Sequence, residues 1–119
     1  MINTPNKRTS PISQVDVEEE IIRLLNLLEN ETEAFETLAE DSAKKEARYK
    51  AEWAKSYLSA SGSIKEREAW ADYQMESKAL DHKLAEGLLK AKREKLTSLR
   101  TSIDALRTLN ANVRSMTMP

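Results

Sequence analysis

The chain of 119 residues contains no cysteine, so disulfide bonds and thiolate metal sites are excluded. Its three prolines, Pro5, Pro11 and Pro119, stand near the two ends, and its only glycines are Gly62 and Gly87. Proline and glycine are the residues that interrupt helices, so the long middle of the chain has almost no helix breakers. Aromatic residues make up only 5% of the sequence, which is little for a compact globular core.

Long apolar runs are also absent. The longest apolar cluster, residues 21–28, contains Arg23 and Asn26 and is far too short to span a bilayer. The first 14 residues are polar and lack the apolar centre of a signal peptide. The sequence therefore predicts a soluble cytoplasmic protein without membrane contact.

What the sequence does contain is the composition of long helices, because Ala, Glu, Lys, Leu and Arg dominate residues 15–118. We expect residues 1–14 to form a flexible arm and a helix to cover 15–60, capped by Ser13 or Asp16. Apolar residues then recur at helical spacing. They are Val17, Ile21, Leu24, Leu28, Phe35 and Leu38.

A turn is expected at 61–63, where Gly62 suits a left-handed backbone and Ser63 with Glu66 has capping-box spacing. A second helix should then cover 64–114. Such a short turn makes the two helices antiparallel neighbours. The predicted fold is all-α: a long, coiled-coil-like helical hairpin that occupies residues 15–116.

Charge supports this pairing. Folding back at the turn places residue i opposite roughly residue 123 − i. Residues 16–41 contain ten acids and one base, and they face residues 82–107, which contain seven bases and three acids. Opposite charges therefore meet along the helices and favour this register over others.

The side chains expected in the seam between the helices are of two sizes. Large side chains pair near the free ends, and alanines fill the middle of the first helix. In the second helix, Leu80, Leu84 and Leu88 form one stripe, and the leucines from Leu89 onward form another. This change of stripe at Gly87 predicts a bend or a change of partner. The alanines are Ala39, Ala43, Ala47, Ala51 and Ala54.

The apolar content of residues 21–28 exceeds what one two-stranded seam needs. We therefore expect a homo-oligomer, formed as a multi-helix bundle near the free ends. The alternative is that residues 1–14 fold back over the surplus. The expected oligomer interface consists of Ile21, Ile22, Leu25, Leu28, Leu99 and Leu106.

Residues for catalysis are scarce, so we expect no enzyme, no cofactor and no metal. The only histidine, His82, lies in a polar stretch, where a surface position is expected. No Glu-x-x-His pair is present to hold a di-iron centre, and no glycine-rich loop is present to hold a phosphate.

The aromatic residues gather near the turn, where 123 − i places Trp53 opposite Trp70 and Tyr49 near Tyr73. One interpretation is that these rings pack on one another. The other is that some stack on unpaired bases while nearby cations hold phosphates. Those cations are Lys44, Lys45, Arg48, Lys50, Lys55, Lys65 and Arg67.

Arginine recurs at every seventh position in 93–114, as Arg93, Arg100, Arg107 and Arg114. Two interpretations remain open: a rail of salt bridges to the first helix, or contacts with an anion such as a nucleic-acid backbone. We expect Arg93 and Arg100 in the rail. We expect anion contact from Arg114, which has no obvious acid opposite it, and leave Arg107 between the two.

The segments SGSIKEREAWADYQ and KAKREKLTSLRTSIDALRTLNANVR resemble phage recombination mediators of the T4 UvsY type. The resemblance covers roughly residues 35–116. It implies a homo-oligomer in the bacterial cytoplasm that binds single-stranded DNA and helps to load a RecA-like recombinase against a single-strand-binding protein. The acidic segment 16–41 departs from a uniformly DNA-binding surface.

The sequence therefore leaves two hypotheses for the function. The first is a recombination or replication accessory protein that binds single-stranded DNA, with the seven cations near the turn, Arg107 and Arg114 as contacts. The alternative is a helical protein-interaction module, an adaptor or inhibitor, without nucleic-acid contact.

Overall fold

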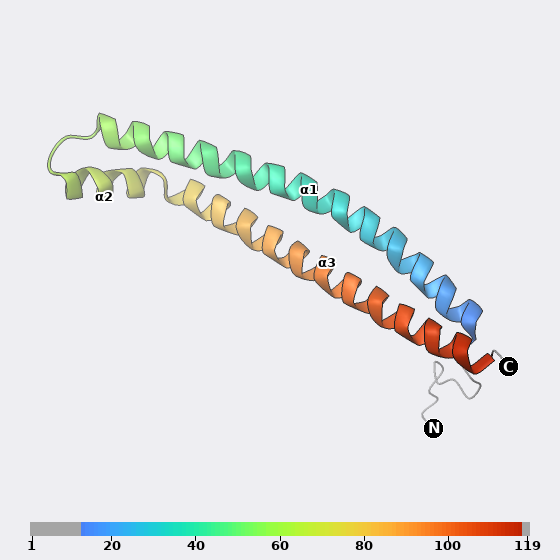
Figure 1. The fold of residues 1–119 in the computed structure, drawn as a ribbon. Helices are drawn as coiled ribbons and strands as arrows, with labels where there is room; N and C mark the ends of the chain where they lie inside the picture. The colour runs from blue at the N-terminus through green and yellow to red at the C-terminus, as the bar shows by residue number, and fades with distance from the viewer. Residues whose placement is uncertain (1–12, 118–119) are drawn as a thin grey trace, which may run out of the picture. The chain divides into compact units, whose positions relative to one another are not determined.

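The structure is a computed structural model that describes residues 13–117, and in this part only Ser13, the turn at 60–63 and Met75 lie outside helices. Helix α1 covers Gln14–Ser59, α2 covers Ile64–Gln74 and α3 covers Glu76–Thr117 (Figure 1). The expected all-helical class is confirmed for this part of the chain. Residues 1–12 of the expected N-terminal arm lie outside the described residues.

Both helix starts that the sequence predicts are capped. The hydroxyl of Ser13 accepts a hydrogen bond from the backbone N–H of Asp16 at 3.1 Å and donates one to its carboxylate at 2.8 Å. Ser63 makes the same two contacts with Glu66, each at 3.2 Å. A serine hydroxyl thus satisfies one free N–H at each helix start, as the capping box requires.

The second helix is interrupted at Met75, which the sequence analysis did not anticipate. Met75 has φ −101° and ψ 10°, outside the helical range. Its N–H still donates to the carbonyl of Ala71 at 3.0 Å, and its carbonyl accepts from Ala79 at 2.8 Å. The change expected at Gly87, a bend or a change of partner, does not break the helix, because α3 continues through that residue.

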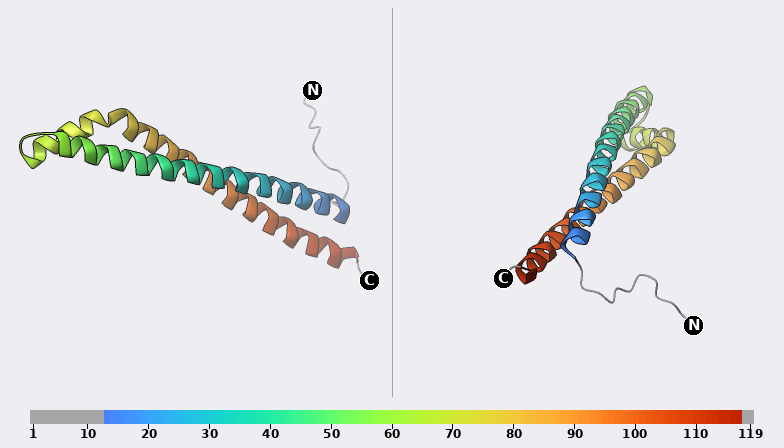
Figure 2. Two further views of the ribbon diagram at one scale, coloured as in Figure 1. Left: turned by 90° about the horizontal axis from the view of Figure 1, so that it is seen from above. Right: turned by 90° about the vertical axis from the view of Figure 1, so that its right-hand side faces the viewer.

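The chain divides into two units, described separately. In the first, residues 13–30 at the start of α1 lie antiparallel to residues 96–117 at the end of α3 (Figures 1 and 2). Its core is built from Leu24, Leu99 and Ile103, with Leu28 and Leu106 packed against it. The large seam predicted near the free ends is therefore confirmed.

The second unit, residues 31–95, contains the rest of α1, all of α2 and the beginning of α3. Its buried residues are small: Ser42, Ala71 and Ala85. The predicted alanine seam was wrong. Ala43, Ala47, Ala51 and Ala54 are exposed, and only Ala39 is half-buried. The seam of α1 instead follows residues 35, 42 and 49, each seven positions apart, and this line misses the alanines.

The two leucine stripes of α3 have different environments. Leu80, Leu84 and Leu88 are 57%, 60% and 58% exposed, whereas Leu89 is half-buried. The stripe that begins at Leu89 is thus the seam. The other stripe is an apolar strip on the surface of the second unit.

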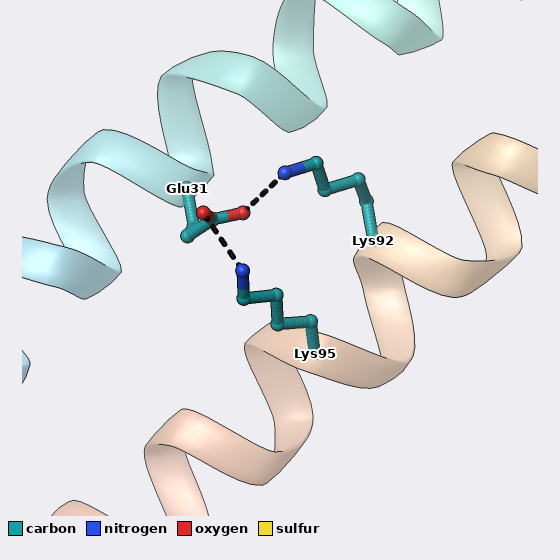
Figure 3. Close-up of polar contacts among 3 residues, drawn as sticks. All are labelled: Glu31, Lys92 and Lys95. Carbon is teal, nitrogen blue, oxygen red and sulfur yellow. Dashed lines mark hydrogen bonds and ion pairs between the residues drawn. The ribbon is translucent and has the colours of Figure 1, made fainter.

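An ion-pair cluster lies inside the seam of the second unit (Figure 3). The two carboxylate oxygens of Glu31 accept hydrogen bonds from Lys92 at 2.6 Å and from Lys95 at 3.1 Å. The Glu31 side chain is only 13% exposed. These hydrogen bonds, with that from Lys92 the larger cause, hold the pKa of Glu31 below its ordinary value. The predicted register places residue 31 opposite residue 92, and this contact agrees with it at this position.

Candidate nucleic-acid interface

The turn at residues 60–63 fixes where α2 lies. Gly62 adopts φ 109°, a region that side chains with a Cβ rarely enter. A Cβ built there would come within 2.5 Å of the carboxylate of Glu66. The glycine therefore allows the chain to reverse immediately before Ser63 starts α2, which returns along the end of α1 (Figure 1).

The aromatic rings do not pack across the hairpin as one interpretation expected. Trp53 stacks on Tyr57 of its own helix, with centroids 5.5 Å apart and planes 12° apart. Its indole N–H donates to the carboxylate of Asp72 on α2 at 2.8 Å. Trp53 is therefore tied to α2 through a polar contact, and its predicted packing against Trp70 was wrong.

Trp70 and Tyr73 form a separate pair on α2. Their centroids are 6.2 Å apart, and their planes are tilted by 34°. Trp70 is 47% exposed and Tyr73 is 71% exposed. A hollow of about 480 Å³ beside Trp70 is lined by Ser59, Ala60, Ser61 and Glu66. Since α2 buries only Ala71, its two large rings are left at the surface.

Tyr49 lies over His82 rather than Tyr73. The two rings stack with centroids 6.0 Å apart, and Nε2 of His82 lies 2.9 Å from the carboxylate of Glu86. The His82 side chain is 14% exposed, and its Nδ1 is buried without a hydrogen-bond partner. The expected surface position was therefore wrong, because residue 82 continues the seven-residue spacing of the α3 seam.

Three of the candidate cations near the turn are engaged by acids of their own helix. Lys44 pairs with Glu40 at 2.9 Å, Lys45 with Asp41 at 3.1 Å, and Lys50 with Glu46 at 2.8 Å. The hydrogen bond between Lys50 and Glu46 raises the pKa of the lysine and lowers that of the glutamate. Such exposed pairs are weak, so these lysines remain available to a stronger anion at modest cost.

The other candidate cations have no ion pair within residues 13–117. Arg48 lines a hollow of about 140 Å³ together with Lys45, Tyr49, Lys78 and Asp81. The Nε of Arg67 is buried without a hydrogen-bond partner. Lys55 lies on the last turns of α1 and Lys65 on the first turn of α2. Residues 42–83 hold nine bases and seven acids, so the region is slightly basic.

Lys78 also belongs to this basic region, although it was not among the residues predicted from the sequence. Lys78 forms an ion pair with Glu52 on α1 and lines the same hollow as Arg48. The simple 123 − i register places residue 78 opposite residue 45, a base. The observed partner is one heptad further along α1, and no signal in the sequence marks that shift.

The four arginines of the stripe have four different environments. Arg93 lies over the ring of Phe35, 5.7 Å from its centroid. Arg107 lies 3.6 Å from Asp104 of its own helix, and Arg114 lies 3.9 Å from Glu18 on α1. Arg100 has no ion pair within the described residues. The expectation that Arg114 lacks an acid was wrong, because residue 114 pairs further along α1 than the simple register places it.

The residues expected at an oligomer interface fall into two groups. Leu99 is buried in the core of the first unit, and Leu28 and Leu106 pack against that core. Ile21 is half-buried, whereas Ile22 and Leu25 are 59% and 39% exposed. Ile22 and Leu25 are therefore the members of this set that are most exposed to another molecule.

The described part of the chain offers little else in the way of chemistry. Within residues 13–117, no cluster of three histidine or carboxylate side chains is arranged to hold a metal ion. No helix in this range combines the length and apolar character that crossing a membrane demands. The exposed rings near the turn, with the nearby cations that have no ion pair within residues 13–117, are therefore one candidate binding site.

No protein-family model, no curated protein and no solved structure matches this chain.

Proposed function

We propose that the chain is a non-enzymatic accessory protein of phage recombination or replication. In this proposal it binds single-stranded DNA as a homo-oligomer and assists the loading of a RecA-like recombinase, with a single-strand-binding protein as a further partner. The DNA contact is assigned to the region around the turn, namely α2 with the end of α1.

One observation supports the DNA contact: Trp70 and Tyr73 are exposed on α2, a helix whose two cations have no ion pair within residues 13–117. Lys65 and Arg67 precede the two rings on the same helix, and Lys55 lies near the end of α1. Exposed rings provide stacking surfaces for unpaired bases, and the cations attract the phosphates between them. A duplex keeps its bases stacked on one another, so this surface favours single strands.

A fluorescence-anisotropy titration with labelled oligo-dT, run beside a duplex of equal length, tests the proposal. Trp70→Ala should weaken oligo-dT binding by about fivefold or more, because one base stack is worth ~1–3 kcal/mol. Leu58→Ala is the matched control, since Leu58 is 76% exposed near the same turn and has no ring. Equal affinity for the duplex, or an unchanged Trp70→Ala variant, contradicts the proposal.

Salt provides a second measurement. If Lys55, Lys65 and Arg67 contact phosphates, replacing Lys55 and Lys65 by Gln should reduce the slope of log affinity against log salt by about one to two units. Lys90→Gln on α3 is the control and should leave the slope unchanged. Arg107 and Arg114 already have acid neighbours, so they are the weaker candidates for phosphate contact.

A helical protein-interaction module is the second candidate, and the exposed strip of Leu80, Leu84 and Leu88 favours it. The pairing of Lys44, Lys45 and Lys50 with acids of their own helix points the same way. If this candidate holds, oligo-dT should fail to bind even at about 50 mM salt. Leu84→Asp should then remove the binding of the protein partner.

A further inference from the structure

The first unit contains a groove with an apolar floor and a charged rim. Its volume is about 240 Å³, and it is lined by Leu25 and Leu28 of α1 and by Arg100, Ile103, Asp104 and Arg107 of α3. Apolar grooves of this kind between two helices accept the apolar face of a third helix. The positive rim favours a helix that carries acids beside its apolar residues.

One cation of the rim has no ion pair in the part of the chain that the structure describes. Arg100 is exposed and has no ion pair within residues 13–117. Arg107 has one ion-pair contact within the same range, with Asp104 at 3.6 Å. The nearby acids of α1 are engaged elsewhere: Glu20 holds Arg23, and Glu18 lies near Arg114. An acidic partner would therefore meet at least one available guanidinium here.

A helix with the matching pattern is present in the same chain. At the start of α1, residues 15, 22 and 29 are seven positions apart and share one face. Val15 and Ile22 on this face are about 60% and 59% exposed. Glu29 on the same face and Glu19 beside it are exposed and form no ion pair within the described residues. This face therefore offers apolar contacts and free carboxylates together.

We propose that the groove of one copy receives the acidic face of α1 from a second copy of this chain. Each copy supplies both a groove and an acidic face, so the contact is made twice around a two-fold axis. Placing α1 of one copy on α3 of the other brings carboxylates to Arg100 and Arg107. Placing α1 against α1 would bring acids together and is disfavoured. This inference specifies the homo-oligomer of the proposed function and rests on it.

Reciprocal charge reversal tests the pairing. One variant carries Arg100→Glu with Arg107→Glu, and the other carries Glu19→Lys with Glu29→Lys. Light scattering at micromolar concentration should give the wild type at least twice the mass of the 13.5 kDa chain and each variant alone the mass of one chain. A 1:1 mixture should regain the larger mass, because each variant's altered charges meet their opposites on the other. Circular dichroism must show both variants folded.

Lys83→Glu with Lys90→Glu is the matched control, with the same change of charge on α3 away from the groove. It should associate like the wild type. A monomeric wild type, unaffected reversal variants, a mixture that stays at the mass of one chain, or loss of association only in the control would each overturn the proposal.

DNA binding is measured separately, so that the two proposals fail independently. Trp70→Ala should lose oligo-dT binding and keep the wild-type mass. If Trp70→Ala binds DNA normally while charge reversal behaves as expected, the DNA proposal fails and the oligomer contact stands.

Discussion

The carboxylate of Glu31 lies between two ammonium groups of α3, 2.6 Å from that of Lys92 and 3.1 Å from that of Lys95. Glu31 and Lys92 both occupy seam positions, where apolar side chains are the rule. A shift of α3 by one heptad would leave Glu31 facing an apolar residue without a cation. The pair therefore favours one register, in the way that single polar residues set register in coiled coils.

Glu31→Gln should remove an acid-dependent part of the stability. The pKa of Glu31 is lowered from its ordinary value of 4.5 in the folded state, so the unfolded chain binds a proton at higher pH than the folded chain. The stability that ionised Glu31 contributes is thus complete above pH 4.5. It is lost as the pH falls through the pKa that Glu31 has in the folded state, which is lower. Urea unfolding followed from pH 7 to pH 3 should show less loss for Glu31→Gln than for the wild type. Glu33→Gln, an exposed neighbour, should follow the wild type.

Leu99→Asp should unfold the first unit or destabilise it strongly. Leu99 is 9% exposed against Leu24 and Ile103, so the substitution buries an unpaired carboxylate at a cost of several kcal/mol. Leu84→Asp on the same helix is the control, because Leu84 is 60% exposed. Thermal melts followed by circular dichroism should separate the two variants. Similar melting temperatures would mean that the seam has been assigned to the wrong face.

The two glycines should respond to alanine in opposite directions. Gly62→Ala places a Cβ at φ 109° and against Glu66, which should cost about 1–3 kcal/mol. Gly87→Ala meets no atom within 4 Å in the middle of α3, so it should stabilise by about 0.5–1 kcal/mol. Chemical denaturation of both variants and of the wild type measures whether each substitution raises or lowers the free energy of unfolding. A destabilised Gly87→Ala would show that the surface at this position is covered.

Within the arginine stripe, Arg93→Gln should lower stability more than Arg100→Gln. The guanidinium of Arg93 lies over Phe35, a contact worth about 0.5–1 kcal/mol at an exposed site. Arg100 has no such contact in the described part of its own chain. The comparison should be made at protein concentrations low enough for the protein to be monomeric, since Arg100 is assigned to the contact between copies. Equal losses of stability would argue against this difference.

The sequence predicted the extent of the helical regions and their approximate register, because both depend on local and repeating signals. Serine followed three residues later by an acid marks a helix start, and Gly62 marks the reversal. The opposite charges of the two helices fix their approximate alignment, and Glu31 with Lys92 agrees with it.

The sequence did not predict correctly which residues lie in the seam where more than one face of a helix could pack against the other helix. The alanines from Ala43 to Ala54 form a regular stripe, yet the seam runs through Ser42 and Tyr49 beside them. The interruption at Met75 has no proline or glycine to announce it. The pairing of Arg114 with Glu18 requires a register further along α1 than a uniform rule provides. The position of the seam, the interruption at Met75 and the pairing of Arg114 depend on how whole helices pack against each other. The spacing of residues along the sequence does not specify that packing.

Because of the interruption at Met75, the amides of α2 and those of α3 should differ in their rates of hydrogen exchange. Because the helix is interrupted there, α2 can unwind for a moment without disturbing the regular hydrogen bonds of α3. The opening of α2 exposes little apolar surface, since only Ala71 is buried on it. Its amides should therefore exchange as one cooperative group at lower free energy than the amides of α3 around Leu99. The segment that carries Trp70 and Tyr73 can thus change its conformation while the rest of the described chain stays folded, which the proposed contact with DNA would use.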